Sequence, residues 1–182
     1  HRHDHGQPGN AVTGSYARRR RRAHMEIRRF SGEYAEQVSA LVKRNLLEVN
    51  ARDYPLAEME ALSSRYDADR VRAIAAGGHM YAALEEGRVV GAGAISPAGA
   101  GECLIQTVFV LPEYHGAGIG RALMAALEAD EYFLNASRAE LFASITARGF
   151  YERLGYAHKG GIMRLDGEML YCMEKRAGAG RE

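Results

Sequence analysis

The sequence predicts an α/β (α+β) domain, and three observations lead to this prediction. Short runs rich in β-branched and aromatic residues alternate along the chain with longer stretches whose apolar residues recur at helical spacing. Clusters of glycine, proline and asparagine separate these runs, as turns and helix ends do. At 182 residues, with 47% hydrophobic and 26% charged residues, the chain is long enough to bury one substantial core.

The first half of the chain predicts a strand, two helical regions and a hairpin. Residues 26–30 form the first β-branched and aromatic run. Apolar residues at helical spacing predict a helix from about residue 31 to Val49, and a second helical region that ends at Gly77-Gly78. Residues 80–84 and 89–95 flank a short turn and predict a β-hairpin.

The second half predicts strands that alternate with helices. A strand over 103–110 leads into a glycine-rich loop and a helix that we expect to run to roughly Leu134. The rest predicts a strand over 138–144, a short helix over 146–154 and two strands over 156–164 and 169–174. We expect one domain over 25–176, a disordered leader or cloning remnant over 1–24, and a C-terminal tail over 177–182.

The loop after the strand at 108–110 is the most informative stretch of the chain. Gly116, Gly118 and Gly120 let the backbone approach a ligand closely and turn successive N–H groups toward it. The first turn of the following helix adds unpaired N–H groups and a partial positive charge. Together these features predict a site for a phosphate or diphosphate, and an ordinary glycine-rich turn is the alternative.

Two common nucleotide loops do not fit this stretch. The dinucleotide pattern G-x-G-x-x-G, counted from Gly116, needs a glycine where Arg121 stands. The P-loop needs a lysine followed by serine or threonine after its last glycine, whereas Arg121-Ala122 follow here.

The segment His115-Gly116-Ala117-Gly118-Ile119-Gly120 resembles the coenzyme A loop of the GNAT superfamily of N-acetyltransferases, whose pattern is Gln/Arg-x-x-Gly-x-Gly/Ala. His115 departs from the first position of that pattern. The resemblance implies that coenzyme A contacts these six residues and Arg121. It also implies that the backbone of Val108, Phe109 and Val110 binds the pantetheine arm like another strand and polarises the acetyl carbonyl.

Residues 143–156 independently resemble a later GNAT motif, Asn-x-x-Ala-x-x-x-Tyr-x-x-x-Gly-Phe. The matching positions are Ser144, Ala147, Tyr151, Gly155 and Tyr156, with serine in place of asparagine and tyrosine in place of phenylalanine. The two motifs have the family's order and separation, and the resemblance covers roughly Met25 to Arg176, nearest to small bacterial enzymes. It implies a mixed, mostly antiparallel central sheet with helices on both faces, and it adds Ser144 and Tyr151 to the coenzyme site.

In the family, the tyrosine at position 151 protonates the departing coenzyme A thiolate. A phenol with a pKa of about 10 can return a proton to a thiolate whose thiol has a pKa of about 8.5. The alternative is that Tyr151 only packs its ring against the sheet.

The acceptor amine must lose a proton before it attacks, because an alkylammonium with a pKa of about 10 is not nucleophilic. Strict alternation along the strand places Glu102 and Gln106 on one face with Val108 and Val110. Glu102 is therefore the first candidate for the general base, and a solvated carboxylate at the strand edge is the alternative.

Polar residues near the chain break after the first helix are candidates to bind the acceptor. They are Asn50, Asp53, Tyr54 and, on the strand, Gln106. Asp53 capping the second helical region is the alternative.

Charge and cysteine content narrow the classes of function. Residues 1–24 hold six arginines and one aspartate, which leaves 18 basic and 22 acidic residues and a formal charge of −4 on the rest. Such a body is not expected to bind nucleic acid. Cys103 and Cys172 lie in apolar runs and predict buried thiols without a metal site. Because no apolar run approaches membrane-spanning length, we expect a cytoplasmic protein.

The sequence therefore predicts an acyltransferase that moves the acetyl group of acetyl-CoA to a primary amine by direct attack, with no metal. The acceptor is a small molecule or a peptide amine, and a homodimer is possible. A coenzyme A-binding sensor of the same fold without turnover is the first alternative. A nucleic-acid-associated protein recruited through Arg18–Arg22 is the second.

Overall fold

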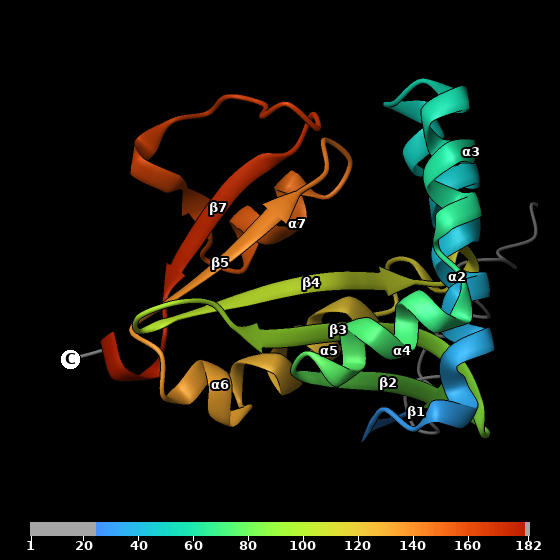
Figure 1. Ribbon diagram of the computed structural model, residues 1–182, viewed down its shortest axis with the longest axis horizontal. Helices are drawn as coiled ribbons and strands as arrows, with labels where there is room; N and C mark the ends of the chain where they lie inside the picture. The colour runs from blue at the N-terminus through green and yellow to red at the C-terminus, as the bar shows by residue number, and fades with distance from the viewer. Residues whose placement is uncertain (1–24, 181–182) are drawn as a thin grey trace, which may run out of the picture.

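The computed structural model describes residues 25–180, and Figure 1 shows their arrangement. The predicted leader over 1–24 lies outside the described residues, as do the last two residues of the predicted tail. Residues 177–180 continue the packed domain: Ala177 is buried and its N–H donates to the Ser137 carbonyl.

One seven-stranded sheet, in the order β1-β2-β3-β4-β5-β7-β6, forms the centre of the domain. Only the β4–β5 pair is parallel among these neighbours, and the others are antiparallel. The predicted mixed, mostly antiparallel sheet is thus confirmed. The strands are β1 Met25–Arg29, β2 His79–Glu85, β3 Arg88–Pro97, β4 Glu102–Val110, β5 Arg138–Ala143, β6 Ala157–His158 and β7 Tyr171–Arg176.

Helices lie on both faces of this sheet, as Figure 1 shows. The α-helices are α2 Ala35–Glu48, α3 Leu56–Arg65, α4 Ala68–Ala76, α5 Ile119–Glu128, α6 Glu131–Leu134 and α7 Arg148–Arg153. The short 3-10 helices are η1 Gly32–Tyr34, η2 Asn50–Arg52, η3 Pro112–Tyr114, η4 Lys159–Gly161 and η5 Gly178–Gly180. None of the helices over residues 25–180 is long and apolar enough to cross a membrane.

Two glycines of β3 allow α5 to pack closely on the sheet. A Cβ built on Gly91 would lie 3.0 Å from Cδ1 of Leu123, and one built on Gly93 would lie 3.0 Å from Cδ1 of Leu127. Any larger residue would push the helix away, because interiors are close-packed. The helix that follows the glycine-rich loop is therefore seated directly on the central strands.

The helix that was predicted to run to Leu134 is interrupted at Asp130. Asp130 caps α6, because its Oδ1 accepts a hydrogen bond from the Tyr132 N–H at 2.8 Å. The other carboxylate oxygen, Oδ2, accepts from Tyr81 at 2.6 Å and is bonded to His79 Nδ1 at 2.8 Å. A buried carboxylate thus ties α6 to β2.

This carboxylate makes the stability of the domain depend on pH. Burial is the largest single influence on the pKa of Asp130, and it acts to raise that pKa. The hydrogen bonds from Tyr81, the Tyr132 N–H and His79 together outweigh burial and hold the pKa below its usual value. A depressed folded-state pKa contributes stability above the unfolded value of about 3.9, and this stability is lost as the pH falls through the folded value.

We therefore expect Asp130→Asn to lower the free energy of unfolding by about 2 kcal/mol at pH 7. The difference from wild type should shrink steadily below about pH 4. Urea unfolding across this pH range measures both effects. The control is Asp69→Asn, since the Asp69 side chain is 91% exposed. A difference that stays constant down to pH 3 would contradict this account.

The predicted strand over 156–164 is wrong apart from two residues. Only Ala157 and His158 pair with β7, and η4 follows directly. Gly160 and Gly161 have φ values of 61° and 72°. These left-handed conformations cannot continue a β-ladder, so the chain leaves the sheet there.

Candidate active site where β4 and β5 diverge

The two parallel strands β4 and β5 are paired over only part of their length. The pairing runs from Glu102 opposite Arg138 to Ile105 opposite Leu141. Gln106 to Val110 continue β4 beyond this segment, and Figure 1 shows the two strands diverging in that direction. The edge of β4 that faces β5 therefore offers backbone groups to a ligand rather than to the sheet.

A bulge in β4 sets the direction of these groups. The register with β3 shifts between Ala92 and Ala94, and Thr107 has a φ of 56°, which is uncommon for a residue other than glycine. The Thr107 hydroxyl is hydrogen-bonded to the Tyr66 hydroxyl at 2.8 Å. The bulge is thus held by a side chain from the end of α3.

The prediction that Gln106 shares a face with Val108 is wrong because of this bulge. Cys103 and Ile105 pack in the core cluster beneath α5, and Val108 packs against the same cluster. Strict alternation would have placed Val108 on the opposite face. One extra residue in the strand reverses the alternation, so Gln106 and Val108 lie on opposite faces.

The direction of the Val110 carbonyl follows from one hydrogen bond. The Leu111 N–H donates to the Val90 carbonyl of β3 at 2.9 Å. In a trans peptide the C=O points away from the N–H that follows it. The Val110 carbonyl therefore points away from β3, toward the diverging side, and it accepts from Asn45 Nδ2 and His115 Nε2, each at 2.8 Å.

The glycine-rich loop continues directly from this strand end into α5. Gly116 and Gly118 have φ values of 76° and 83°, and Gly118 is the residue before the first turn of the helix. The first helical bond runs from Ala122 N–H to the Gly118 carbonyl. The N–H groups of residues 119–121 precede that bond, so they are not used within the helix and are available to an anion.

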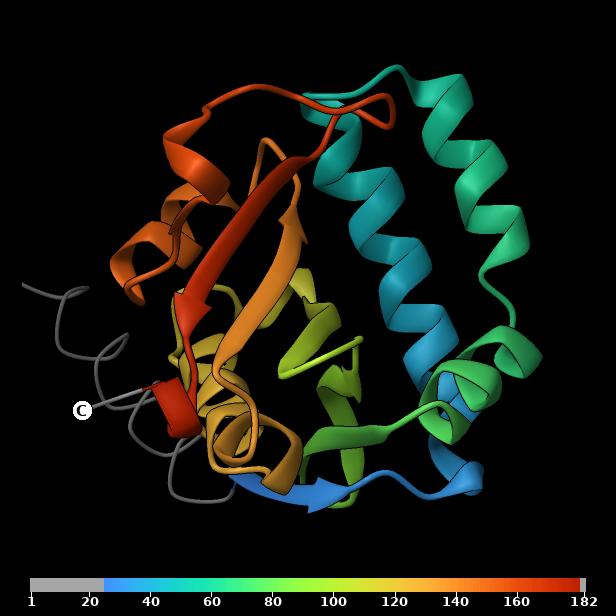
Figure 2. The same ribbon diagram turned by 60° about the vertical axis from the view of Figure 1, so that its left-hand side comes forward.

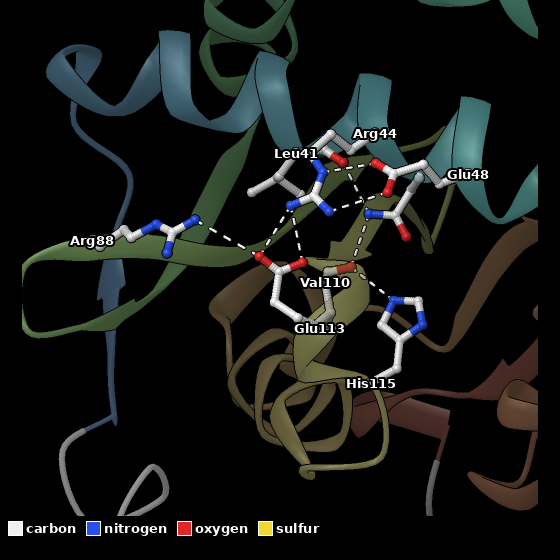
Figure 3. A network of polar contacts seen from close by, with 8 residues as sticks. Leu41, Arg44, Glu48, Arg88, Val110, Glu113 and His115 are labelled. Atoms are coloured by element: carbon white, nitrogen blue, oxygen red, sulfur yellow. Dashed lines mark hydrogen bonds and ion pairs between the residues drawn. The ribbon is translucent and has the colours of Figure 1, made fainter.

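Side-chain contacts hold each residue at the start of this loop, as Figure 3 shows for Glu113 and His115. Arg44 of α2 lies 2.9 Å from Glu113 Oε2 and holds the pKa of the Glu113 carboxyl below its usual value. The Tyr114 hydroxyl donates to Glu85 at the end of β2. The His115 ring binds the Val110 carbonyl, and because a carbonyl only accepts, His115 Nε2 carries the hydrogen.

The His115 side chain is therefore turned back toward the end of β4. Its ring closes the turn from Val110 to His115. Arg121, also a predicted coenzyme contact, is exposed in the first turn of α5.

The second motif lies at the end of β5. Ser144 Oγ accepts from the Ala147 N–H at 3.1 Å and shapes the turn into α7. Phe150 of α7 reaches the start of α5, since a Cβ built on Gly120 would lie 3.2 Å from Phe150 Cζ and 3.8 Å from Val110 Cγ2. Gly120 is thus the point where β4, α5 and α7 meet.

Tyr151 is buried beside this meeting point. Its ring lies edge-on to Phe150 and Tyr156, with centroids 5.1 Å and 6.0 Å away. Burial raises the pKa of the Tyr151 hydroxyl above its usual value, so the phenol stays protonated at neutral pH. Both of the predicted motifs are therefore brought to the same end of the sheet.

The chain between α2 and α3 lies across the diverging strands. The Tyr54 hydroxyl accepts from the Ile145 N–H at 2.9 Å and donates to the Met169 carbonyl at 2.7 Å. Thr146 Oγ1 donates to Asp53 Oδ2 at 2.6 Å. Figure 2 shows this link meeting the loop that precedes β7. Asp53 therefore holds the β5 side of the site rather than capping α3, whose N-cap is Pro55.

Of the other predicted acceptor residues, Asn50 begins η2 and its carbonyl accepts from the Tyr54 N–H at 3.0 Å. Gln106 is half-buried at the start of the diverging segment of β4.

Glu102 lies at the opposite end of β4. It is ion-paired with Arg138 on the segment where β4 and β5 are joined. Val108 is six positions further along the strand, which corresponds to about 20 Å at 3.3 Å per residue. Neither a direct contact nor one water spans that distance, so this placement argues against Glu102 as the general base.

We expect Glu102→Gln to leave kcat/KM for an amine within about threefold of the wild-type value, whereas loss of a true general base costs about 10²–10⁴-fold. Steady-state kinetics near pH 7.5 measure this ratio. Its control is Glu174→Gln, because Glu174 pairs with the same Arg138 from β7. A hundredfold loss for Glu102→Gln alone would restore its role as base.

Sequence reasoning missed Asn45, which is buried in α2 and donates to the Val110 carbonyl. A signal was present, because Asn45 is a polar residue at a position of the apolar stripe formed by Leu41, Val42 and Leu46. It also missed Thr107, whose positive φ has no sequence signature. Within residues 25–180, no three side chains of His, Cys, Asp or Glu are grouped as metal ligands would be.

Comparison with known proteins assigns the class of this fold and site. No curated protein sequence matches the chain. Solved structures do: PaiA N-acetyltransferase from Thermoplasma acidophilum, in complex with coenzyme A, has a TM-score of 0.69 at 18% identity, covering 84% of this chain and 98% of that one. A GCN5-related N-acetyltransferase from Rhodopseudomonas palustris has a TM-score of 0.69 at 24% identity, covering 83% and 94%.

A GNAT-family acetyltransferase from Staphylococcus aureus Mu50 has a TM-score of 0.64 at 15% identity, covering 84% of this chain and 98% of that one. These likenesses establish the fold, and the enzyme class is that of the acyltransferases. Residues 76–158 match the family model of the acetyltransferase (GNAT) domain, a span that contains both the glycine-rich loop and Tyr151. Residues 76–158 are thus the part of the chain that matches the GNAT family of acetyltransferases.

Proposed function

We propose that this acetyltransferase moves the acetyl group of acetyl-CoA to a primary amine by direct attack, with Tyr151 as general acid. The observation that supports this proposal is the meeting of three features at Gly120: the diverging edge of β4, the amides at the start of α5, and α7 with its buried phenol.

The diphosphate of acetyl-CoA fits the loop between η3 and α5. The N–H groups of residues 119–121, which are not used within the helix, and the positive end of the α5 dipole attract an anion there. A Cβ built on Gly116 would meet nothing within 4 Å, so the loop leaves space for phosphate oxygens. The anchored residues Glu113, Tyr114 and His115 hold this loop in place before the substrate binds.

The pantetheine arm then lies along the diverging edge of β4. The N–H groups of Val108 and Val110 point away from β3 by alternation after the bulge, and they can donate to the carbonyls of an extended arm. An N–H of this edge, aimed at the acetyl carbonyl, stabilises the negative charge that develops on its oxygen. We assign this donor to Val108, the first residue after the bulge.

The reaction proceeds through one tetrahedral intermediate. The neutral amine nitrogen attacks the acetyl carbon and forms the C–N bond, the C–S bond breaks, and the departing thiolate takes a proton from the Tyr151 hydroxyl. Counted from its ammonium form, the amine loses two protons: one passes to solvent before the attack, and the other leaves the attacking nitrogen and returns to the phenolate. The net products are an amide, a thiol and one proton. Burial raises the pKa of the Tyr151 hydroxyl, so the phenol still holds its proton when the thiolate departs.

A panel of amines and thiol detection test this proposal. We expect purified protein to release thiol from acetyl-CoA only when a primary amine is present, with formation of the matching acetamide seen by mass spectrometry. A protein that binds acetyl-CoA and releases no thiol with any amine would instead be a coenzyme-binding sensor. Release that is equally fast without an amine would indicate hydrolysis.

A further inference from the structure

Beyond the pair Ile105–Leu141, no backbone hydrogen bonds of the sheet join β4 to β5, so the two arms of the site are separate there. One arm is the β4 segment that ends at Val110, and the other is the end of β5 with the turn at Ile145 and Thr146. Nothing in the sheet itself fixes how far apart these arms stand. The coenzyme arm and the acceptor both have to fit between them.

Residues 44–54 connect the arms from outside the sheet; we refer to this segment as the strut. At its first end, Asn45 is buried in α2 and uses both amide hydrogens, one on the Leu41 carbonyl at 2.9 Å and one on the Val110 carbonyl at 2.8 Å. The neighbouring Arg44 binds Glu113, three residues beyond Val110, as Figure 3 shows. The strut therefore holds the β4 arm and the start of the glycine-rich loop.

At its other end, the strut holds the β5 arm. The Tyr54 hydroxyl bridges the Ile145 N–H and the Met169 carbonyl, and Asp53 accepts from Thr146. Tyr54 is 7% exposed, so water does not easily replace these bonds. Between the two ends, backbone hydrogen bonds continue from α2 into η2. The Val49 N–H donates to the Asn45 carbonyl, and the Tyr54 N–H donates to the Asn50 carbonyl.

We infer that Asn45 and Tyr54 are positioning residues that set the width of the gap between β4 and β5. This inference rests on the proposed binding of the pantetheine arm along β4. Neither residue needs to touch the reacting atoms. Their effect is to keep the amides of β4 and the phenol of Tyr151 at a fixed separation, so that the thioester lies against both.

The test compares coenzyme A with ADP, which carries the diphosphate without the pantetheine arm. Tyr54→Phe keeps the buried ring and removes only the hydroxyl, and Asn45→Leu replaces the amide with an apolar group of similar volume. We expect each variant to bind coenzyme A about tenfold more weakly, the loss that one or two hydrogen bonds account for. ADP affinity should stay within about twofold of wild type, because the loop that binds its phosphates is unchanged.

The double variant gives the sharper result. If both residues hold the same gap, the loss of either one opens it. The double variant should therefore bind coenzyme A about tenfold more weakly than wild type. Two independent sites would instead give a loss of about a hundredfold. Isothermal titration calorimetry measures the dissociation constant of coenzyme A. The change in chemical shift of the Gly118 amide on titration measures that of ADP. With an amine that the protein acetylates, the decrease in kcat should be a larger factor than the change in the KM for that amine.

Two matched controls separate the strut from general loss of stability. Ser137→Ala removes a bond of 2.9 Å to the Gly101 carbonyl, at the end of the sheet where β4 and β5 are joined. Tyr81→Phe removes a phenol bond to Asp130 at the far end of the sheet. Both should bind coenzyme A and ADP as wild type does. If the protein acetylates no amine, the proposed acceptor is refuted. The binding test still applies in that case, because it measures coenzyme A and ADP without turnover.

Three results would overturn the inference. They are equal losses for coenzyme A and ADP, additive losses in the double variant, and coenzyme affinities in Tyr54→Phe and Asn45→Leu that match the two controls.

Discussion

Replacing Tyr151 by phenylalanine should lower kcat for amine acetylation by about 10²–10⁴-fold, the usual contribution of a positioned general acid. The ring stays in place between Phe150 and Tyr156, so packing is preserved and only the proton donor is lost. The dissociation constant of coenzyme A should change by less than about threefold, because the phenol acts on the leaving thiolate and not on the bound ground state.

Thiol release under saturating acetyl-CoA and calorimetric titration of coenzyme A measure these two quantities separately. Tyr156→Phe is the matched control, since its phenol is buried nearby and its hydroxyl lies 3.4 Å from Glu128 Oε2, away from the loop. Turnover of Tyr151→Phe equal to that of Tyr156→Phe would show that the phenol at 151 only packs. A substrate whose leaving thiol is more acidic should recover part of the lost rate.

Gly118→Asp should weaken coenzyme A binding by about 10²–10³-fold. A carboxylate at this position would face the diphosphate at the start of α5, and two like charges about 4 Å apart repel by about 4 kcal/mol near a protein surface. The φ of 83° adds a smaller cost for any residue other than glycine.

The backbone cost can be measured apart from the charge. Gly87 has a similar φ of 79° in the β2–β3 turn, and a Cβ there would meet nothing within 4 Å. Gly87→Asp should therefore show the backbone effect on stability while coenzyme A binding stays at the wild-type level. Gly118→Ala should lie between wild type and Gly118→Asp in coenzyme affinity. If Gly118→Asp binds coenzyme A as tightly as Gly87→Asp does, the diphosphate does not lie at the loop.

Local patterns were sufficient to predict the strand, glycine-rich loop and helix on which the proposed coenzyme site depends. The alternate glycines at 116, 118 and 120 and the tyrosine at 151 belong to short segments, and a loop between a strand and a helix has the same geometry wherever it occurs. The order of strands and helices followed from periodicity for the same reason. The match of residues 76–158 to the acetyltransferase (GNAT) domain spans both segments.

The predictions that failed concern features that depend on contacts between segments far apart in the sequence. A periodic pattern cannot reveal that Tyr66 holds Thr107 in a bulge, and without the bulge the faces of β4 are assigned wrongly. Glu102 looked suitable as a base because it is an acid on the right strand, but the strand carries it to the wrong end. Polarity near a chain break made Asp53 and Tyr54 candidates to bind the acceptor, but it could not indicate the bonds they make with Thr146 and Ile145.

A crystal structure of the protein with bound coenzyme A tests the central claim most directly. We expect the diphosphate to accept hydrogen bonds from amides within residues 116–121, the pantetheine arm to pair with Val108 and Val110, and the sulfur to lie within hydrogen-bonding distance of the Tyr151 hydroxyl. A diphosphate bound away from the start of α5, or a Tyr151 hydroxyl directed away from the sulfur, would contradict it.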